Sequence, residues 1–297
     1  MSTDTITPTS EYDASTLAIT KESAGGLSLR RGPGPVLTLM QKLADRVLFA
    51  RDAVVASIGW NGDFSVDPGG TNATFAINLG TIGAVVTGTS GGVYRALSGG
   101  GVAIGATKIL GGGNLANSTW HYVYCWDNAG TLDYEITTTA PSGSRRTKSG
   151  DATRRYLGCF RTTSAGAPIP VRASRGRYVY DLGGGLTALF DALSGGADTS
   201  FTAVSLASLV PPHARLATVR ALATAGAAPG IAGAVEVQSY GSASTGTHSV
   251  YSPSVTGFTN ATTYDIPTDS SQRVQYRVVG GGAAPTATIA VLGYMEG

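Results

Sequence analysis

The chain is 297 residues long, enough for two domains that each bury a hydrophobic core. It contains 42 Gly, and charged residues make up 13 % of it, about half of the share usual in soluble proteins. The formal net charge of +2 does not by itself indicate a partner. No apolar run approaches the ~20 residues that span a bilayer, so membrane insertion is not expected.

Residues 1–35 are rich in Ser and Thr and show no apolar period. Such a segment is expected to be extended or disordered unless another molecule holds it. It ends on Arg30-Arg31-Gly32-Pro33-Gly34-Pro35, after which a helix can begin.

Residues 36–56 predict one short amphipathic helix. Apolar residues recur at the alternating spacings of four and three that form a coiled-coil seam. This helix seam consists of Val36, Met40, Leu43, Val47, Ala50 and Val54. Other apolar residues, among them Leu48 and Phe49, lie off the seam, so the helix either self-associates or packs on its own β-domain. At a length of ~32 Å it would need the β-domains to help hold three chains together.

The rest of the chain is predicted to form β-strands separated by glycine-rich turns. We assign these strands to a first β-domain over 57–182 and a second over 201–297. The best hairpin joins His121–Trp126 to Leu132–Ile136 through Asp127-Asn128-Ala129-Gly130. Residues 183–200 form a Gly-rich connector. We therefore predict a mainly β fold of two β-sandwich or jelly-roll-like modules preceded by one short helix. Its terminal strand, 286–294, should pair deep in a sheet.

Catalytic chemistry has little support in the residue pattern. The histidines His121, His213 and His248 have no companion Cys, His or carboxylate at metal-ligand spacing. Carboxylates are sparse, and the pair Asp133 and Glu135 is typical of a solvated strand face, although acids assembled in space remain an alternative. We expect no enzyme, cofactor or metal site.

The two cysteines, Cys125 and Cys159, each lie inside a strand-like run. They are interpreted as buried thiols of a protein made in a reducing cytoplasm. A disulfide bond would be possible if their strands were neighbours.

Nine of the 21 basic residues lie between Arg145 and Arg177, with aromatic residues among and just after them. This pattern indicates a face for an anionic partner, or else arginines on ordinary exposed strands. No recognised nucleic-acid motif accompanies it, so nucleic acid is not expected. The candidate binding residues of this basic strip are Arg154, Arg155, Arg175, Arg177, Tyr178 and Tyr180.

Two segments have a distinctive pattern of aromatic and polar residues. The first is Asn117-Ser-Thr-Trp-His-Tyr-Val-Tyr-Cys-Trp-Asp-Asn-Ala-Gly-Thr-Leu-Asp-Tyr-Glu-Ile-Thr-Thr-Thr-Ala-Pro141; the second is Arg155-Tyr-Leu-Gly-Cys-Phe-Arg-Thr162 with Arg177-Tyr-Val-Tyr180. Both segments resemble tail-fibre and related virion proteins of tailed bacteriophages. The resemblance covers about a third of the chain and marks structural strands. Long tail fibres carry repetitive shafts and this chain has none, so the resemblance favours a short tail fibre, a head fibre or a decoration protein.

The resemblance implies a virion component, assembled in the host cytoplasm. Residues 1–35 would attach it to other virion proteins, the helix would gather a homotrimer, and the β-modules would bind the host surface, with polysaccharide as one possible target. Binding would be multivalent. One alternative is a tail spike that degrades polysaccharide. Another is a bacterial adhesin or lectin, for which no signal peptide is visible.

Overall fold

The computed structural model describes residues 42–43, 46–47, 63–80, 82–88, 94–99, 101–142, 147–181, 190–226, 233–242, 247–253, 255, 257–280 and 285–296. The described part is mainly β, as predicted, and the named strand pairs in it are antiparallel. Within it, no helix has the length and apolar character to cross a membrane.

The chain folds into two compact units that are interleaved along the sequence. Unit 1 comprises Met1–Asp63, Asn78–Gly112 and His121–Gly158, and unit 2 comprises Phe64–Ile77, Gly113–Trp120 and Cys159–Gly297. This differs from the expected succession of 57–182, 183–200 and 201–297. The difference arises because segments distant in sequence complete each other's sheets.

Unit 1 is built around a four-stranded sheet in the order β7-β6-β9-β8. Its strands are β6 (Trp120–Asn128), β7 (Thr131–Thr137), β8 (Thr147–Lys148) and β9 (Asp151–Arg161). The predicted hairpin is confirmed: β6 pairs with β7 from Tyr122↔Thr137 to Asn128↔Thr131. Its turn places Ala129 and Gly130 at φ of 52° and 90°, the left-handed pair that a two-residue hairpin needs.

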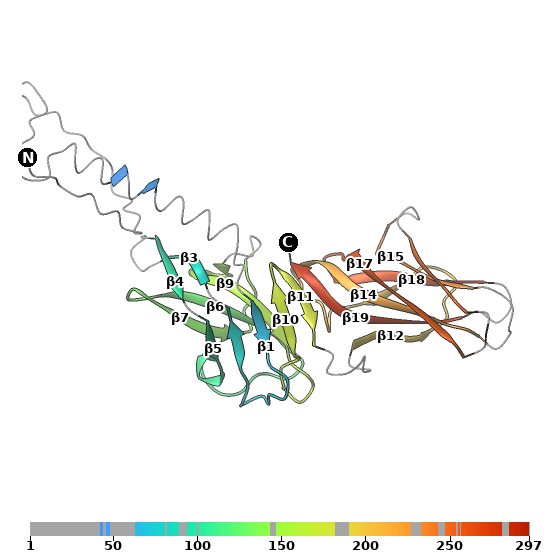
Figure 1. Cartoon of the computed structure of the whole chain (residues 1–297), viewed down its shortest axis with the longest axis horizontal. Helices are drawn as coiled ribbons and strands as arrows, with labels where there is room; N and C mark the ends of the chain where they lie inside the picture. The colour runs from blue at the N-terminus through green and yellow to red at the C-terminus, as the bar shows by residue number, and fades with distance from the viewer. Residues whose placement is uncertain are drawn as a thin grey trace, which may run out of the picture. The chain divides into compact units, whose positions relative to one another are not determined.

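Unit 1 also contains a hairpin of β3 (Ile82–Gly88) and β4 (Tyr94–Gly99). Strand β5 (Val102–Ile104) neighbours β2 (Ile77–Leu79) and leads into the short 3-10 helix Ala106–Lys108 (Figure 1). The described α-helical residues are Lys42, Leu43, Arg46 and Val47. The other four seam positions, Val36, Met40, Ala50 and Val54, and residues 1–35 lie outside the described residues.

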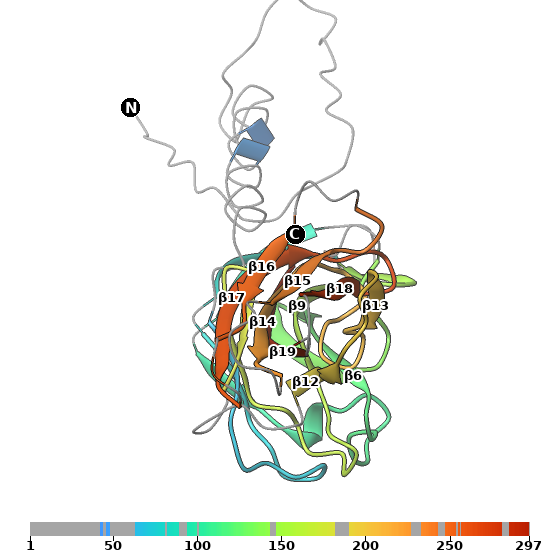
Figure 2. The same ribbon diagram turned by 90° about the vertical axis from the view of Figure 1, so that its right-hand side faces the viewer.

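Unit 2 is a sandwich of two antiparallel sheets. Seven of the nine strands of the larger sheet lie in unit 2: β1 (Phe64–Val66), β10 (Val171–Ser174), β11 (Arg177–Tyr180), β12 (Asp191–Gly196), β14 (Ala214–Thr224), β17 (Thr259–Pro267) and β19 (Thr286–Glu296). The smaller contains β13 (Thr202–Ser205), β15 (Ala234–Ser239), β16 (His248–Tyr251) and β18 (Arg273–Val279). Figure 2 shows the two layers, with β17, β14 and β19 facing β16, β15 and β18.

The C-terminal strand β19 lies in the interior of the larger sheet, with partner strands on both sides, as its alternating pattern predicted. On one side it pairs with β14 along its length, and on the other it pairs with β12 and then with β11. The tight approach of β11 needs a glycine at position 293, because a Cβ there would lie 2.1 Å from the carbonyl oxygen of Tyr178.

Residues on both sides of the expected boundary at 182 therefore belong to one sheet. β1, β10 and β11 come from the expected first β-domain and β19 from the second. Part of the expected connector forms strand β12. Glycines at this point mark a break in the local pattern, but they do not determine which strands pair.

Candidate functional site

Two positions of the helix seam are described, and both are exposed. Leu43 and Val47 are helical and lie four residues apart, so their side chains share one face. Their exposed fractions are 59 % and 63 %. Because core positions of a coiled coil are buried when the partner helices are present, this face is uncovered in the single chain.

The basic strip is divided between the two units. Arg154 and Arg155 lie on the part of β9 that belongs to unit 1, while Arg175 and Arg177 lie at the β10–β11 hairpin of unit 2. Each pair is therefore described in its own unit, and the sequence run does not by itself define one surface.

Arg154 is held by a buried carboxylate. Its Nε donates to Glu135 Oε2 at 3.1 Å, and its guanidinium lies 4.2 Å from the Trp126 ring centroid. Lys148 Nζ donates to Glu135 Oε1 at 2.8 Å. The Glu135 side chain is 5 % exposed, so the two cations compensate a charge that would otherwise be costly to bury. Arg154 thus has a structural partner, and Arg155, opposite Thr147, is half-buried.

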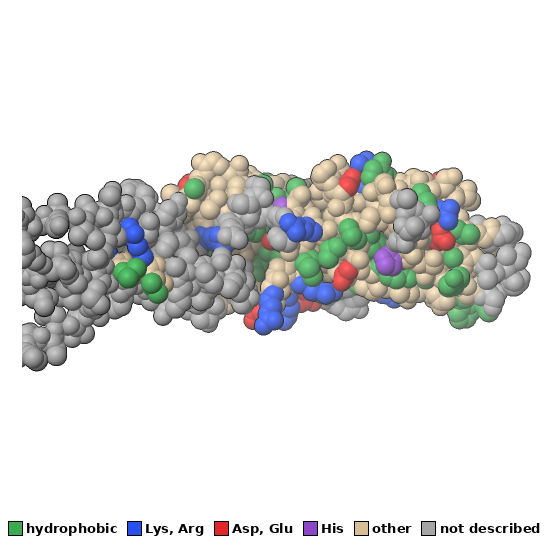
Figure 3. Space-filling model, turned by 90° about the horizontal axis from the view of Figure 1, so that it is seen from above, with side chains coloured by type: hydrophobic (Ala, Val, Ile, Leu, Met, Phe, Trp, Pro, Cys, Tyr) green, Lys and Arg blue, Asp and Glu red, His purple; other side chains and the backbone are tan. Residues whose placement is uncertain are grey.

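The arginines of unit 2 are more accessible. Arg175 and Gly176 form the β10–β11 turn with positive φ, and Arg175 is exposed. The Arg177 side chain is 49 % exposed and its Nη2 lies 3.6 Å from Asp265 Oδ2. On the face shown in Figure 3, basic and acidic side chains lie next to each other.

Tyr178 and Tyr180 were expected to face a partner, and this is wrong because both rings are in the core. They are 3 % and 4 % exposed. Tyr178 stacks on Tyr294 with ring centroids 4.5 Å apart, and the Tyr180 hydroxyl donates to the Leu209 carbonyl. The alternation of β11 places Arg177 outward and the two tyrosines inward.

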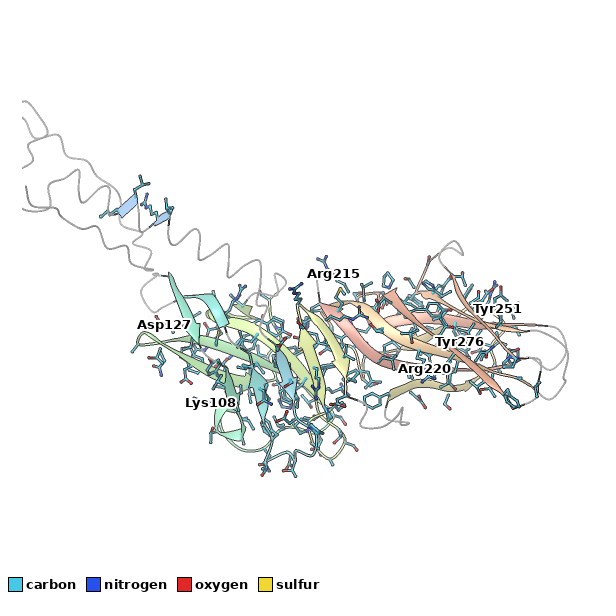
Figure 4. The ribbon with its side chains drawn as sticks, viewed as in Figure 1. Lys108, Asp127, Arg215, Arg220, Tyr251 and Tyr276 are labelled. Carbon is cyan, nitrogen blue, oxygen red and sulfur yellow. The ribbon has the colours of Figure 1, made fainter. Side chains whose placement is uncertain are left out.

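Several described carboxylates of this chain have a lowered pKa. Burial alone would raise the pKa of Asp133, but hydrogen bonds from Lys108 Nζ (Figure 4) and its own backbone neighbour Tyr134 outweigh it and the pKa falls. The pKa of Asp151 and that of Asp269 are lowered in the same way, against burial, by hydrogen bonds to the ionised form. A general acid of a glycosidase needs the opposite shift, so these three are poor candidates for it.

A different group of side chains meets in unit 2. Cys159 on β9, His213 in the turn before β14 and Glu296 at the end of β19 have ligand atoms within 4.8 Å of one another. His213 Nε2 lies 2.9 Å from Glu296 Oε1, and Cys159 Sγ lies 3.5 Å from the same oxygen. Sequence reasoning missed this group because the three residues are far apart in the chain. Their positions along the chain form no recognisable metal-binding sequence motif.

The cysteines are buried, as interpreted from the sequence. No disulfide bond links Cys125 and Cys159, both of which the structure describes. Burial raises the pKa of Cys125 to about 12, despite the opposing effects of the Arg155 charge and a backbone hydrogen bond. Cys125 is therefore a protonated packing residue at neutral pH.

Exposed apolar side chains also gather in unit 2, within the segment from the end of β16 to the start of β17. Tyr251, Val255 and Phe258 are 68 %, 53 % and 63 % exposed. Tyr251 projects from the end of its strand in Figure 4, and the Asn260 amide donates to its carbonyl oxygen at 3.0 Å. We refer to these three residues as the 251–258 patch.

Comparison with known proteins assigns no family. No family model and no curated protein matches the chain. A chain from a solved structure titled "Structure of infectious bursal disease virus Gx strain" matches over 81 % of this chain and 68 % of that chain, with 12 % identity and a TM-score of 0.23. At this TM-score the similarity carries no argument about function.

Proposed function

We propose that this chain is a structural subunit of a virion, of the short-fibre, head-fibre or decoration type, that associates with copies of itself and displays β-modules for binding. The observation that carries the proposal is the exposure of Leu43 and Val47 on the helix seam. The resemblance of Asn117–Pro141 to tailed-phage virion proteins supports the assignment to a virion.

The exposure of Leu43 and Val47, the two described seam positions, supports one of the two roles considered for the helix. A helix packed on its own β-domain would cover Leu43 and Val47, whereas a self-associating helix presents them to its copies. Burying one such side chain contributes about 1.5–3 kcal/mol, so a seam of six positions per chain can contribute substantially to association. The spacing and the exposure together favour self-association, with three copies expected.

The 251–258 patch is the surface best suited to binding. Tyr and Phe are enriched where proteins contact partners, and single exposed rings of this kind gain affinity through repetition. Three subunits would present three patches, so weak individual contacts to a host-surface polysaccharide would add up to firm attachment. The exposed Arg175 and Arg177 are a second, charge-based contact.

The binding role is tested by adsorption of the purified chain to host cells. The double variant Tyr251→Ser/Phe258→Ser should lose most of the adsorption, because it removes two exposed rings without touching the core. Val279→Ser is the matched control, since Val279 is also an exposed apolar residue of unit 2, at 40 %. Equal adsorption of the two variants would contradict the assignment of the patch.

The virion setting is tested separately by imaging particles labelled with an antibody to this chain. Label on the head or the tail is expected; label confined to the cell envelope would instead indicate an adhesin. Shortened glycans after incubation with the protein would indicate a degrading spike.

A further inference from the structure

The strongest unassigned feature is the group formed by Cys159, His213 and Glu296. A thiol, an imidazole and a carboxylate are the side chains that bind zinc in proteins. Here they approach one another from three separate parts of unit 2, with all ligand atoms within 4.8 Å.

The distances suit a single ion. Zinc binds sulfur at about 2.3 Å and nitrogen or oxygen at about 2.0–2.2 Å, which puts neighbouring ligand atoms of a tetrahedral site about 3.4–3.6 Å apart. The Sγ–Oε1 distance of 3.5 Å already matches. The Nε2–Oε1 distance is 2.9 Å, so this pair has to open by about 0.5 Å to reach the tetrahedral value.

The charges also balance. A thiolate and a carboxylate supply two negative charges and neutral imidazole supplies none, so a divalent cation makes the group neutral. This matters because Cys159 is fully buried and the His213 and Glu296 side chains are 11 % exposed each. An excess charge in such a place is costly, whereas a neutral ion complex is tolerated.

The backbone anchors His213 and Glu296 without an ion, and Cys159 lies within strand β9. His213 follows two prolines in a turn closed by the hydrogen bond from Ala214 N to Pro211 O, at 3.0 Å. Glu296 is fixed by its own N–H, which donates to Gly176 O at 2.9 Å. A site formed by side chains on such anchored segments loses little conformational freedom when it binds.

We propose that Cys159, His213 and Glu296 bind one divalent transition-metal ion, with zinc as the preferred ion. The ion replaces the hydrogen bond between His213 Nε2 and Glu296 Oε1 and displaces the Cys159 thiol proton, which passes to solvent, while the neutral imidazole that binds through Nε2 carries its proton on Nδ1. A water molecule completes the fourth position. The ion ties the end of β19 to β9 and to the turn before β14, so its role is structural and independent of the proposed virion function.

The test begins with the complete chain stripped of metal by a chelator. Zinc chloride should bind at one ion per chain and raise the melting temperature. Cobalt chloride should give the near-ultraviolet absorption band that arises from charge transfer between a thiolate and cobalt. Absence of saturable binding at one ion per chain would overturn the proposal and would leave an ordinary hydrogen-bonded group.

Variants then assign the ligands. Cys159→Ser should lose the cobalt band. Glu296→Gln and His213→Gln should each weaken zinc binding by at least about 100-fold, because loss of a residue that only hydrogen-bonds to a metal ligand already weakens binding by up to about 100-fold. The controls are Cys125→Ser and His248→Gln, which alter the other thiol and another histidine and should bind as the wild type does. Circular dichroism identifies any variant that has not folded. If another ligand variant fails to fold, zinc binding is compared between the wild type and Glu296→Gln, which preserves the shape of the side chain. A cobalt band that persists in Cys159→Ser refutes the assignment.

Discussion

Replacing Glu135 by Gln removes the charge that holds Lys148 and Arg154 together while preserving the shape of the side chain. Breaking a buried ion pair by removing one partner costs about 3–5 kcal/mol, because the remaining charge stays buried. The Lys148 and Arg154 side chains are 13 % and 24 % exposed, so they can partly regain water. We therefore expect a loss of about 2–3 kcal/mol in the free energy of unfolding.

For a protein of this size, 1 kcal/mol corresponds to about 2–4 °C in melting temperature, so Glu135→Gln should melt about 4–12 °C below the wild type. Differential scanning fluorimetry measures this. The control is Asp181→Asn, which breaks the pair with Arg172, whose side chain is 76 % exposed, and which should cost less than about 1 kcal/mol. Equal shifts in the two variants would show that burial of the Glu135 group is not what makes it stabilising.

Three further outcomes follow from single positions. Gly293→Ala places a Cβ 2.1 Å from the Tyr178 carbonyl oxygen, so chemical unfolding should show a loss above about 3 kcal/mol, whereas Gly101→Ala, with its nearest atom at 3.5 Å, should be well tolerated. The pKa of Asp133 is lowered in the folded protein, so its carboxylate stabilises the fold fully above the unfolded pKa of about 3.9 and loses this effect as pH falls through the lower folded pKa. Below pH ~4 the melting temperature should therefore fall more steeply for the wild type than for Asp133→Asn. Parallel curves of melting temperature against pH would exclude this role. Because the pKa of Cys125 is raised to about 12, iodoacetamide at pH ~8 should label it only after unfolding, as read by peptide mass spectrometry; labelling of the native protein would show that it is accessible.

Local patterns predicted the elements that depend on neighbouring residues. The Asp127–Gly130 turn and the alternation beside it were sufficient for the β6–β7 hairpin, because a two-residue turn fixes the register of both strands. The alternating run at 286–294 likewise indicated a strand that pairs deep in a sheet, and β19 has partner strands on both sides. The mainly β class followed from the same signals.

Pairing between distant segments could not be read from the sequence. Nothing local to β11 indicates that it pairs with β19, so the interleaving of the two units was missed. Cys159, His213 and Glu296 meet for the same reason: the register of β19 carries Glu296 to the turn that holds His213. Tyr178 was different, because the two-residue period of β11 already placed it on the face opposite Arg177, and the surrounding arginines obscured that signal.

Sedimentation velocity of the full chain across a dilution series tests self-association most directly. The wild type should sediment as a trimer, and Leu43→Asp/Val47→Asp should shift it to monomer, since each aspartate would bury a charge in the seam. Lys42→Glu, next to the seam, should leave the trimer intact. A wild-type chain that remains a compact monomer at all concentrations would contradict the account.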